Sequence, residues 1–246
     1  MDKRHRRASQ AAISQMKLDI LRELNAARRS REAAILVTDT ETGEARLLRA
    51  DAARPDALAA ELEKRLRSGR SGLLEDGRTF LTVQVPPPRL VVIGAVHISQ
   101  ALAPIARIAG FDVTIIDPRT AFATPERFHD TRLIAEWPEE ALSDAPLDAY
   151  TALVALSHDP KIDDQPLLAA FAAGCFYVGA LGSRKTHAKR QERLQKQGAT
   201  AADVARIHAP IGIDIAAQSP AEIAVAILAE VIAAMRRGPR AERIAA

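Results

Sequence analysis

The 246-residue chain is 48% hydrophobic and 26% charged, a composition typical of globular proteins and a length sufficient for one large domain or two smaller ones. Its net charge of +3 is concentrated in residues 1–32, which carry nine Lys or Arg and four Asp or Glu, so the remainder is slightly acidic. A basic excess confined to one segment, with only 4% aromatic residues in the chain, argues against nucleic-acid binding and favours a solvated basic surface.

The composition also bears on the cellular compartment. No apolar run reaches the length of a membrane span, and the first residues lack the apolar core of a signal peptide. The single cysteine, Cys175, excludes an internal disulfide and is typical of a reducing environment. Its apolar sequence context favours a core position over a reactive thiol. We therefore expect a cytoplasmic protein without a membrane span.

Residues 1–85 predict a small α+β domain. It ends before Pro86, Pro87 and Pro88, because three consecutive prolines favour a stiff, extended connector. The first helix is amphipathic and basic, and two short strands flank a Gly-containing turn as in a hairpin. The expected elements are a helix over 8–28, strands over 33–38 and 46–49, a helix over 55–66 and a strand over 79–85.

From residue 89 onward, strands and helices alternate. This pattern predicts a Rossmann-like, doubly wound parallel sheet of the α/β class over residues 89–238, followed by a tail over 239–246. Each strand is a short, continuous apolar run, as expected where helices cover both faces of a sheet. The expected strands cover 90–93, 113–116, 151–157 and 175–179, and the expected helices cover 98–109, 160–173, 183–197 and 220–237, with a short helix after residue 200.

The first strand, the first helix and the second strand, which ends on Asp117, have the layout of a nucleotide-binding βαβ unit. The glycine fingerprint of such units is broken, because Val96 and Ser99 stand where the second and third glycines belong. The frame is therefore predicted without the phosphate fingerprint. A β-branched residue tolerates positive φ poorly, so we expect the turn to keep its Rossmann-like path with Val96 at negative φ.

The segment after the fourth strand predicts an anion-binding loop. Gly179 and Gly182 allow a close backbone approach, and the helix that starts at Ser183 supplies free amide groups. Residues 183–197 contain six Lys or Arg and one Glu. The alternative interpretation is a solvated basic helix without a ligand.

The histidines show no metal-binding spacing, so no metal site is predicted, and no catalytic motif is present. His97, at the start of a helix, is placed to contact an anionic ligand or to order the turn. Asp117 has two open roles, since it can accept hydrogen bonds from ribose hydroxyls or cap its own loop. His158 and Asp159 follow the third strand at the same edge of the sheet.

Five segments of this part of the chain are informative together. They are LVVIGAVH (90–97), SHDPK (157–161), FYVGALGSRKTH (176–187), HAPIGIDI (208–215) and SPAEIAVAILAE (219–230). In their order and spacing they resemble the XdhC/CoxI family of xanthine dehydrogenase accessory proteins. The family's larger N-terminal domain, with its Gly-Ser-Ser-Pro-Arg-like segment and Gly-Gly-Cys motif, has no counterpart here, which indicates a divergent member with a shortened N-terminal domain.

The resemblance implies a maturation chaperone rather than an enzyme. Such proteins are homodimers that bind molybdenum cofactor, in its molybdopterin or dinucleotide form. They deliver it to a molybdenum hydroxylase such as xanthine dehydrogenase or a carbon monoxide dehydrogenase-like enzyme, and a sulfurtransferase is a further implied partner. The resemblance assigns Gly94 and His97 to the first turn, Asp117 and His158 to polar ligand contacts, and Gly179, Gly182, Ser183, Arg184, Lys185 and His187 to the loop that contacts anionic groups.

Two alternatives remain open from the sequence. The βαβ frame and Asp117 are compatible with an NAD(P)-dependent oxidoreductase, although Val96 and Ser99 crowd the place where pyrophosphate approaches the backbone. The other alternative is a docking subunit that contacts the hydroxylase without binding any ligand.

Overall fold

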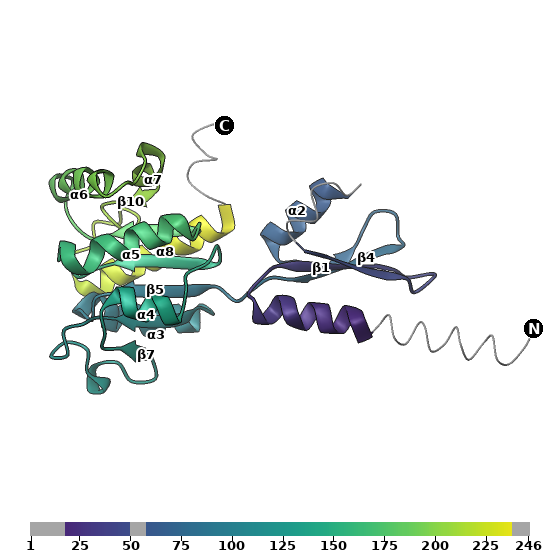
Figure 1. The fold of residues 1–246 in the computed structure, drawn as a ribbon, viewed down its shortest axis with the longest axis horizontal. Helices are drawn as coiled ribbons and strands as arrows, with labels where there is room; N and C mark the ends of the chain where they lie inside the picture. The colour runs from purple at the N-terminus through teal and green to yellow at the C-terminus, as the bar shows by residue number, and fades with distance from the viewer. Residues whose placement is uncertain (1–17, 50–57, 238–246) are drawn as a thin grey trace, which may run out of the picture. The chain divides into compact units, whose positions relative to one another are not determined.

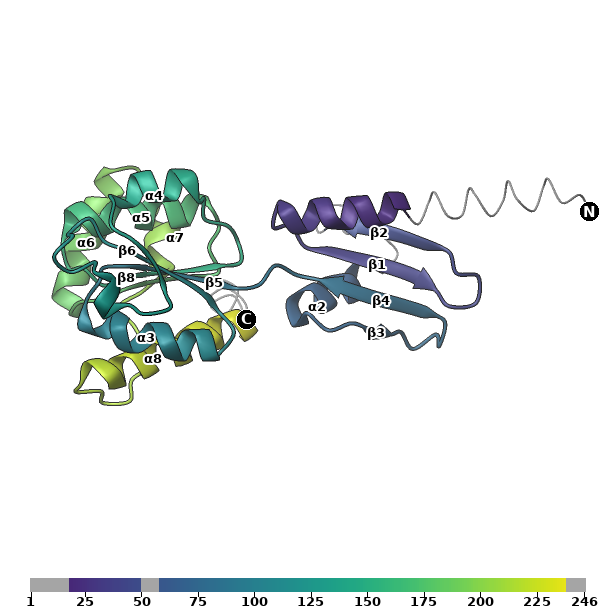
Figure 2. The ribbon, with the colours of Figure 1, turned by 90° about the horizontal axis from the view of Figure 1, so that it is seen from below.

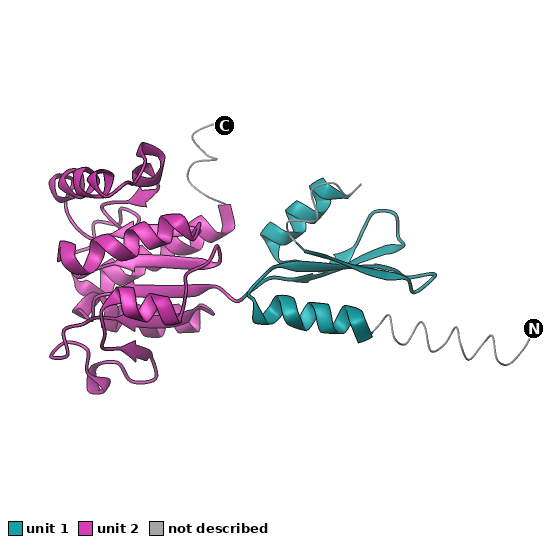
Figure 3. Cartoon of the chain, viewed as in Figure 1, with its two compact units in different colours: residues 1–86 teal, residues 87–246 magenta. Residues whose placement is uncertain are grey.

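A computed structural model describes residues 18–49 and 58–237 of the chain. The chain divides into two compact units, Met1–Pro86 and Pro87–Ala246 (Figure 3). The first unit contains a four-stranded sheet and the second a six-stranded sheet. Among the described residues, none of the helices combines the length and the apolar character that crossing a bilayer requires.

The first unit is an antiparallel sheet of order β2-β1-β4-β3 with a helix on each face (Figure 1). Its core is formed by Ile35, Leu62 and Leu81, which are buried between the sheet and α2. Gly69, in the left-handed region at φ 67°, ends α2. The elements are a helix over 18–29, β1 (Ala34–Asp39), β2 (Ala45–Arg49), α2 (Ala59–Ser68), β3 (Gly72–Leu73) and β4 (Thr79–Gln84).

The predicted hairpin and the predicted strand before the connector are confirmed, whereas β3 was not predicted because it has only two residues. Two predicted segments, 8–17 of the first helix and 55–57 of the second, lie outside the described residues.

The second unit contains a parallel sheet of order β10-β9-β8-β5-β6-β7. Numbered from the first strand of the unit, this is the Rossmann order 3-2-1-4-5-6, with the reversal of strand order between β5 and β8. The predicted α/β fold is confirmed. The strands are β5 (Arg89–Ile93), β6 (Asp112–Ile116), β7 (Arg132–Ile134), β8 (Thr151–Ala155), β9 (Tyr177–Ala180) and β10 (Ile207–His208).

Helices cover both faces of this sheet (Figure 2). Alternate residues of β5 show the two layers, because Leu90 and Val92 pack with α3 and α8, while Val91 and Ile93 pack with α5. A strand buried on both faces needs a continuous apolar run, which is the pattern seen in the sequence. The helices are α3 (His97–Ile108), α4 (Pro138–Asp144), α5 (Pro160–Ala172), α6 (Arg184–Lys196), α7 (Ala201–Ala205) and α8 (Pro220–Arg237), with a 3₁₀ turn over Pro125–Arg127.

Some boundaries differ from the prediction for local reasons. The fourth strand begins at Tyr177 rather than at Cys175, because the Cys175 amide still donates to the Ala170 carbonyl (3.0 Å) and closes the end of α5. Cys175 is nevertheless buried, as expected for a core thiol, and burial raises its pKa to about 12. The third strand ends at Ala155 rather than at residue 157. The segment 118–150, left unassigned by the sequence, contains the 3₁₀ turn, β7 and α4.

Candidate functional site

The loops that follow β5, β6, β8 and β9, here called the carboxyl edge, include most residues that the sequence singled out. The centre of this edge is the Gly94 turn, residues 94–97, between β5 and α3. Gly94 has φ 113°, and a Cβ on it would lie 2.9 Å from the backbone nitrogen of Ser157. Ligands of Rossmann sheets bind where β5 and β8 end, because the strand order reverses there. At this point the two chain segments touch through a position that only glycine fits.

Val96 and Ser99 adapt the Gly94 turn to its altered sequence. Val96 is extended at φ −101°, which confirms the expected negative φ. Ser99 is fully buried, and its hydroxyl donates to the Gly94 carbonyl, so it is part of the turn itself. His97 is the first residue of α3 and its side chain is exposed at the carboxyl edge.

Asp117, at the end of β6, has both carboxylate oxygens engaged within the protein. Oδ2 accepts from the Ala95 amide (2.7 Å) and from Nη2 of Arg119 (2.7 Å), and Oδ1 accepts from Nε (2.9 Å) and the amide of Arg119. Burial raises the pKa of Asp117, but the Arg119 and Ala95 hydrogen bonds more than offset this, so the pKa lies below its ordinary value. Of the two open roles, the geometry matches the ordering of its own loop and leaves no oxygen for ribose.

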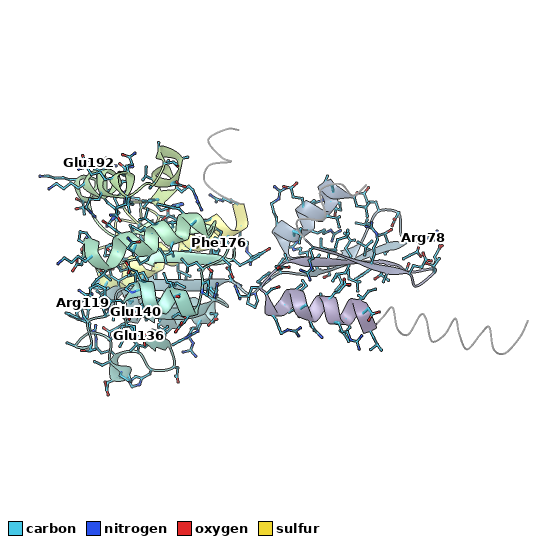
Figure 4. The ribbon with its side chains drawn as sticks, in the orientation of Figure 1. Arg78, Arg119, Glu136, Glu140, Phe176 and Glu192 are labelled. Carbon is cyan, nitrogen blue, oxygen red and sulfur yellow. The ribbon has the colours of Figure 1, made fainter. Side chains whose placement is uncertain are left out.

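Arg127, which the sequence did not single out, holds the same turn from the other side. Its Nη1 donates to the carbonyls of Ala95 (3.0 Å) and Phe122 (2.7 Å), and its Nη2 donates to Oε1 of Gln100 (3.0 Å). Both backbone groups of Ala95 are therefore bound by side chains, the amide by Asp117 and the carbonyl by Arg127. Figure 4 labels Arg119, which lies at this edge and stacks over the Phe122 ring at 4.7 Å.

His158 follows β8, the strand that pairs with β5 in the sheet. It adopts the left-handed conformation at φ 64°, and its side chain is exposed. Partial burial and the charge of Arg190 lower its pKa, which favours the neutral imidazole. Beside it, the Ser157 hydroxyl donates to Oδ1 of Asp163 (2.7 Å) and accepts from the Asp159 amide (3.0 Å). Asp159 caps α5, because its Oδ1 accepts from the Lys161 amide (2.9 Å).

The loop after β9, residues 181–187, is here called the basic loop. Ser183 caps α6 by accepting from the Thr186 amide (3.2 Å), and Gly182 has φ 134° with Thr186 against the position of a Cβ. Arg184 and Lys185 are exposed in the first turn of α6, and His187 is half-buried. Five of the six predicted anion-binding residues, Gly182, Ser183, Arg184, Lys185 and His187, therefore lie together around a helix N-terminus, where free amides and the helix dipole favour an anion.

Gly179 does not belong to this loop. It lies inside β9 and is buried, and a Cβ there would lie 2.6 Å from Cδ1 of Ile211 and 2.7 Å from the Tyr177 ring. The sequence predicts that Gly179 allows close approach of a ligand, whereas in the structure its missing side chain leaves room for Ile211 and Tyr177.

His208, the first residue of the HAPIGIDI segment, belongs to a structural network. Its Nδ1 lies 2.7 Å from Oε1 of Glu230, whose other oxygen accepts from the Tyr177 hydroxyl and the Gly212 amide (both 2.8 Å). This network fastens the segment after β10 to α8. Across residues 18–49 and 58–237, no three His, Cys, Asp or Glu side chains are arranged to hold a metal ion.

Asp163, in the first turn of α5, is a second residue that the sequence did not indicate. Its side chain is buried, and burial raises its pKa to about 6 despite the Ser157 hydrogen bond and the nearby Arg190 charge, with Asp164 adding to the increase. An ordinary aspartate pKa of 3.8 in the unfolded chain means that the native state binds the proton more tightly. The ionisation of Asp163 should therefore lower the free energy of unfolding of the wild type as the pH rises from about 4 to about 6.

Asp163→Asn mimics the protonated acid and keeps an acceptor for Ser157. Above pH 6 we expect this variant to be more stable than the wild type by about 2 to 3 kcal/mol, because each unit of pKa shift corresponds to about 1.36 kcal/mol. The advantage should shrink toward zero at pH 4. Urea unfolding of both proteins at pH 4, 5, 6 and 7 measures it, and a difference that does not change with pH would contradict the assignment.

Comparison with known proteins places this edge in a family context. The family model for the XdhC Rossmann domain matches residues 90–231, which include all the loops of the carboxyl edge. Three curated relatives are each 33% identical: uncharacterized protein YqeB of Escherichia coli K12, a probable xanthine dehydrogenase subunit of Bacillus subtilis 168, and the molybdenum cofactor insertion chaperone PaoD of E. coli K12. The alignments cover 65%, 62% and 59% of this chain.

The chain spans less than half the length of these relatives, since the alignments cover 30%, 44% and 40% of them. A crystal structure of a xanthine dehydrogenase from Bacillus halodurans superposes with a TM-score of 0.62, over 86% of this chain and 65% of that one. The sequence identity is 21%, so this similarity shows a shared fold.

Proposed function

The chain belongs to the XdhC family, and from this membership we propose that it binds molybdenum cofactor at the carboxyl edge and delivers it to a molybdenum hydroxylase such as xanthine dehydrogenase. In this proposal it acts as a homodimeric chaperone in the cytoplasm, and a sulfurtransferase is a further partner. A carrier needs affinity and release rather than transition-state stabilisation, so it requires no catalytic group.

The observation that carries the proposal is the basic loop at the carboxyl edge, where it follows β9, two strands from the Gly94 turn, with β8 between them. Molybdenum cofactor is a pterin dithiolene with a phosphate or dinucleotide, so it is anionic and partly planar. Arg184 and Lys185 offer two exposed cations at a helix N-terminus that already favours anions. His97 and His158, both exposed at the same edge, offer polar contacts to the remainder of the ligand.

The structure also weighs against the nicotinamide alternative. A ribose-binding acid needs a free carboxylate oxygen, and in Asp117 both oxygens are bound by Arg119 and Ala95. In this proposal Asp117 and Gly94 act on the ligand only through the shape of the turn.

The proposal predicts that Arg184→Ala with Lys185→Ala weakens cofactor binding by about tenfold, because two charge-assisted contacts at an exposed site are lost. The measurement is the molybdenum content of a hydroxylase purified after co-expression with the wild type or the double variant, with fluorescence of the oxidised pterin that co-purifies with each chaperone. The matched control is Arg236→Ala with Lys196→Ala, which removes the same charge from exposed positions outside the basic loop.

We expect the control to support the wild-type molybdenum content and the Arg184/Lys185 variant to reduce it. Equal content with both variants, when omission of the chaperone lowers it, would instead favour a docking subunit that binds no ligand at this loop.

A further inference from the structure

Arg190, on α6, is the most unusual charged residue of the carboxyl edge. Its exposed fraction is 2%, although it belongs to a strongly polar helix in which Leu194 is the other buried residue. Nη2 donates to the Leu181 carbonyl at 2.8 Å, but Nε and Nη1 are buried and find no hydrogen-bond partner within residues 18–49 and 58–237. A buried guanidinium with unpaired donors is destabilising, so its presence calls for a compensating partner.

The nearby acidic side chains do not supply that partner. Asp164 binds Arg193 through both oxygens, at 2.7 and 3.0 Å, and Asp163 accepts from the Ser157 hydroxyl. Within the described part of the chain, neither carboxylate lies at ion-pair distance from Arg190. The two acids attract Arg190 only at longer range, and burial lowers the pKa of its guanidinium.

The position of Arg190 connects it to both loops of the proposed ligand site. Through Nη2 it holds the carbonyl of Leu181, the first residue of the basic loop. Its charge also acts on the His158 imidazole and lowers the pKa of that group. Arg190 thus adds a buried positive charge next to the basic loop and near the turn that follows β8.

We propose that Arg190 binds a phosphate group of the ligand through its unpaired guanidinium donors, with the amides at the start of α6 as additional contacts. Guanidinium groups present several N–H donors in a fixed plane, which suits phosphate oxygens. This inference rests on the proposed function for the identity of the ligand, but it concerns an oxyanion site that is testable without the cofactor. The terminal phosphate of molybdopterin and the pyrophosphate of its dinucleotide form share this chemistry.

Titration of the full-length protein with inorganic phosphate and with pyrophosphate, followed by thermal unfolding, tests the site. Both probes should raise the Tm of the wild type, pyrophosphate at lower concentration if the dinucleotide form is the ligand. Arg190→Met should abolish the increase, and Lys196→Met, which removes a charge from an exposed position on the same helix, should retain it. An increase that persists in Arg190→Met would overturn the proposal.

Unliganded stability separates a binding role from a structural one. Arg190→Met removes a buried charge with unpaired donors, so its Tm without ligand should equal or exceed that of the wild type. Arg193→Met, which breaks the ion pair with buried Asp164, should lower the Tm. A decrease in Arg190→Met as large as in Arg193→Met would show a structural role and contradict the proposal.

Two further measurements keep the test decisive. If Arg190→Met does not fold, Arg190→Lys keeps the charge without the planar donors and should bind pyrophosphate at least about tenfold more weakly; unchanged affinity would count against the proposal. In the wild type, bound phosphate should raise the pKa of His158, followed by NMR titration, because the anion offsets the Arg190 charge. Absence of any phosphate effect on the wild type would refute the Arg190 site while leaving the molybdenum-content experiment to decide cofactor delivery.

Discussion

Asp117→Ala is expected to lower the free energy of unfolding by about 3 to 4 kcal/mol, because it leaves the buried Ala95 amide without an acceptor and removes the ion pair with Arg119. Asp117 has no exposed surface, so water does not readily replace the lost carboxylate. Urea unfolding at pH 7 measures the loss.

Two further variants test whether the loss of stability comes from the carboxylate of Asp117. Asp112→Ala removes an exposed aspartate from the beginning of the same strand and should change stability by less than about 0.5 kcal/mol. Asp117→Asn keeps one acceptor for the Ala95 amide, so its loss of unfolding free energy should lie between those of Asp112→Ala and Asp117→Ala. Since the Asp117 pKa is lowered in the native state, its stabilisation is present above pH 4 and is lost as the pH falls through that lowered value. Equal effects of Asp112→Ala and Asp117→Ala would show that the carboxylate does not hold the turn.

Gly94→Ala is expected to destabilise the protein by about 4 kcal/mol, of which about 2 come from positive φ in a residue with a Cβ and about 2 from overpacking. The new Cβ would lie 2.9 Å from the Ser157 nitrogen and 3.1 Å from its Cα. Backbone atoms cannot rotate away as the end of a flexible side chain does, so the ends of β5 and β8 must separate. The protein that does fold should also bind pyrophosphate more weakly than the wild type.

Gly110→Ala is the matched control for this variant. Gly110 has φ 90°, but no atom lies within 4 Å of the position its Cβ would take. It should therefore show the conformational strain of about 2 kcal/mol without the overpacking, and it should leave anion binding unchanged. Chemical denaturation of both variants separates the two contributions. Equal losses would mean that the contact with Ser157 does not limit position 94.

The parts of the fold that the sequence predicted are those with strong local signals. The buried strands are continuous apolar runs, and the N-termini of α5, α7 and α8 carry the cap residues Asp159, Thr200 and Ser219, whose side chains accept hydrogen bonds from backbone amides. The sheet edges lack such signals. β7 has three residues and β10 has two, which is too short for a periodic pattern to identify a strand. Each forms because it pairs with a longer strand, β6 or β9, at the edge of the sheet.

The site was predicted less completely, because the roles of its residues depend on distant partners. Sequence reasoning left Asp117 with two roles, and only the approach of Arg119 and of the Ala95 amide, 22 residues away, favours one of them. Arg190 is one of six cations in a polar helix, and the composition of that helix does not distinguish the buried cation from the exposed ones. Its position four residues before Leu194, the one leucine of the helix, was the available signal.

The hydrogen bonds that Asp117 and Arg127 make to the two backbone groups of Ala95 have a consequence for the thermodynamics of ligand binding. In glycine-rich nucleotide turns the backbone is free to adopt many conformations, and a ligand that orders it loses part of its binding energy to that ordering. Here Asp117 and Arg127 fix the amide and carbonyl of the turn during folding. An arriving ligand should therefore meet a surface that is already in its bound shape, with a small unfavourable association entropy. A turn built in this way can hold a ligand through few contacts and release it when a partner competes for only some of them.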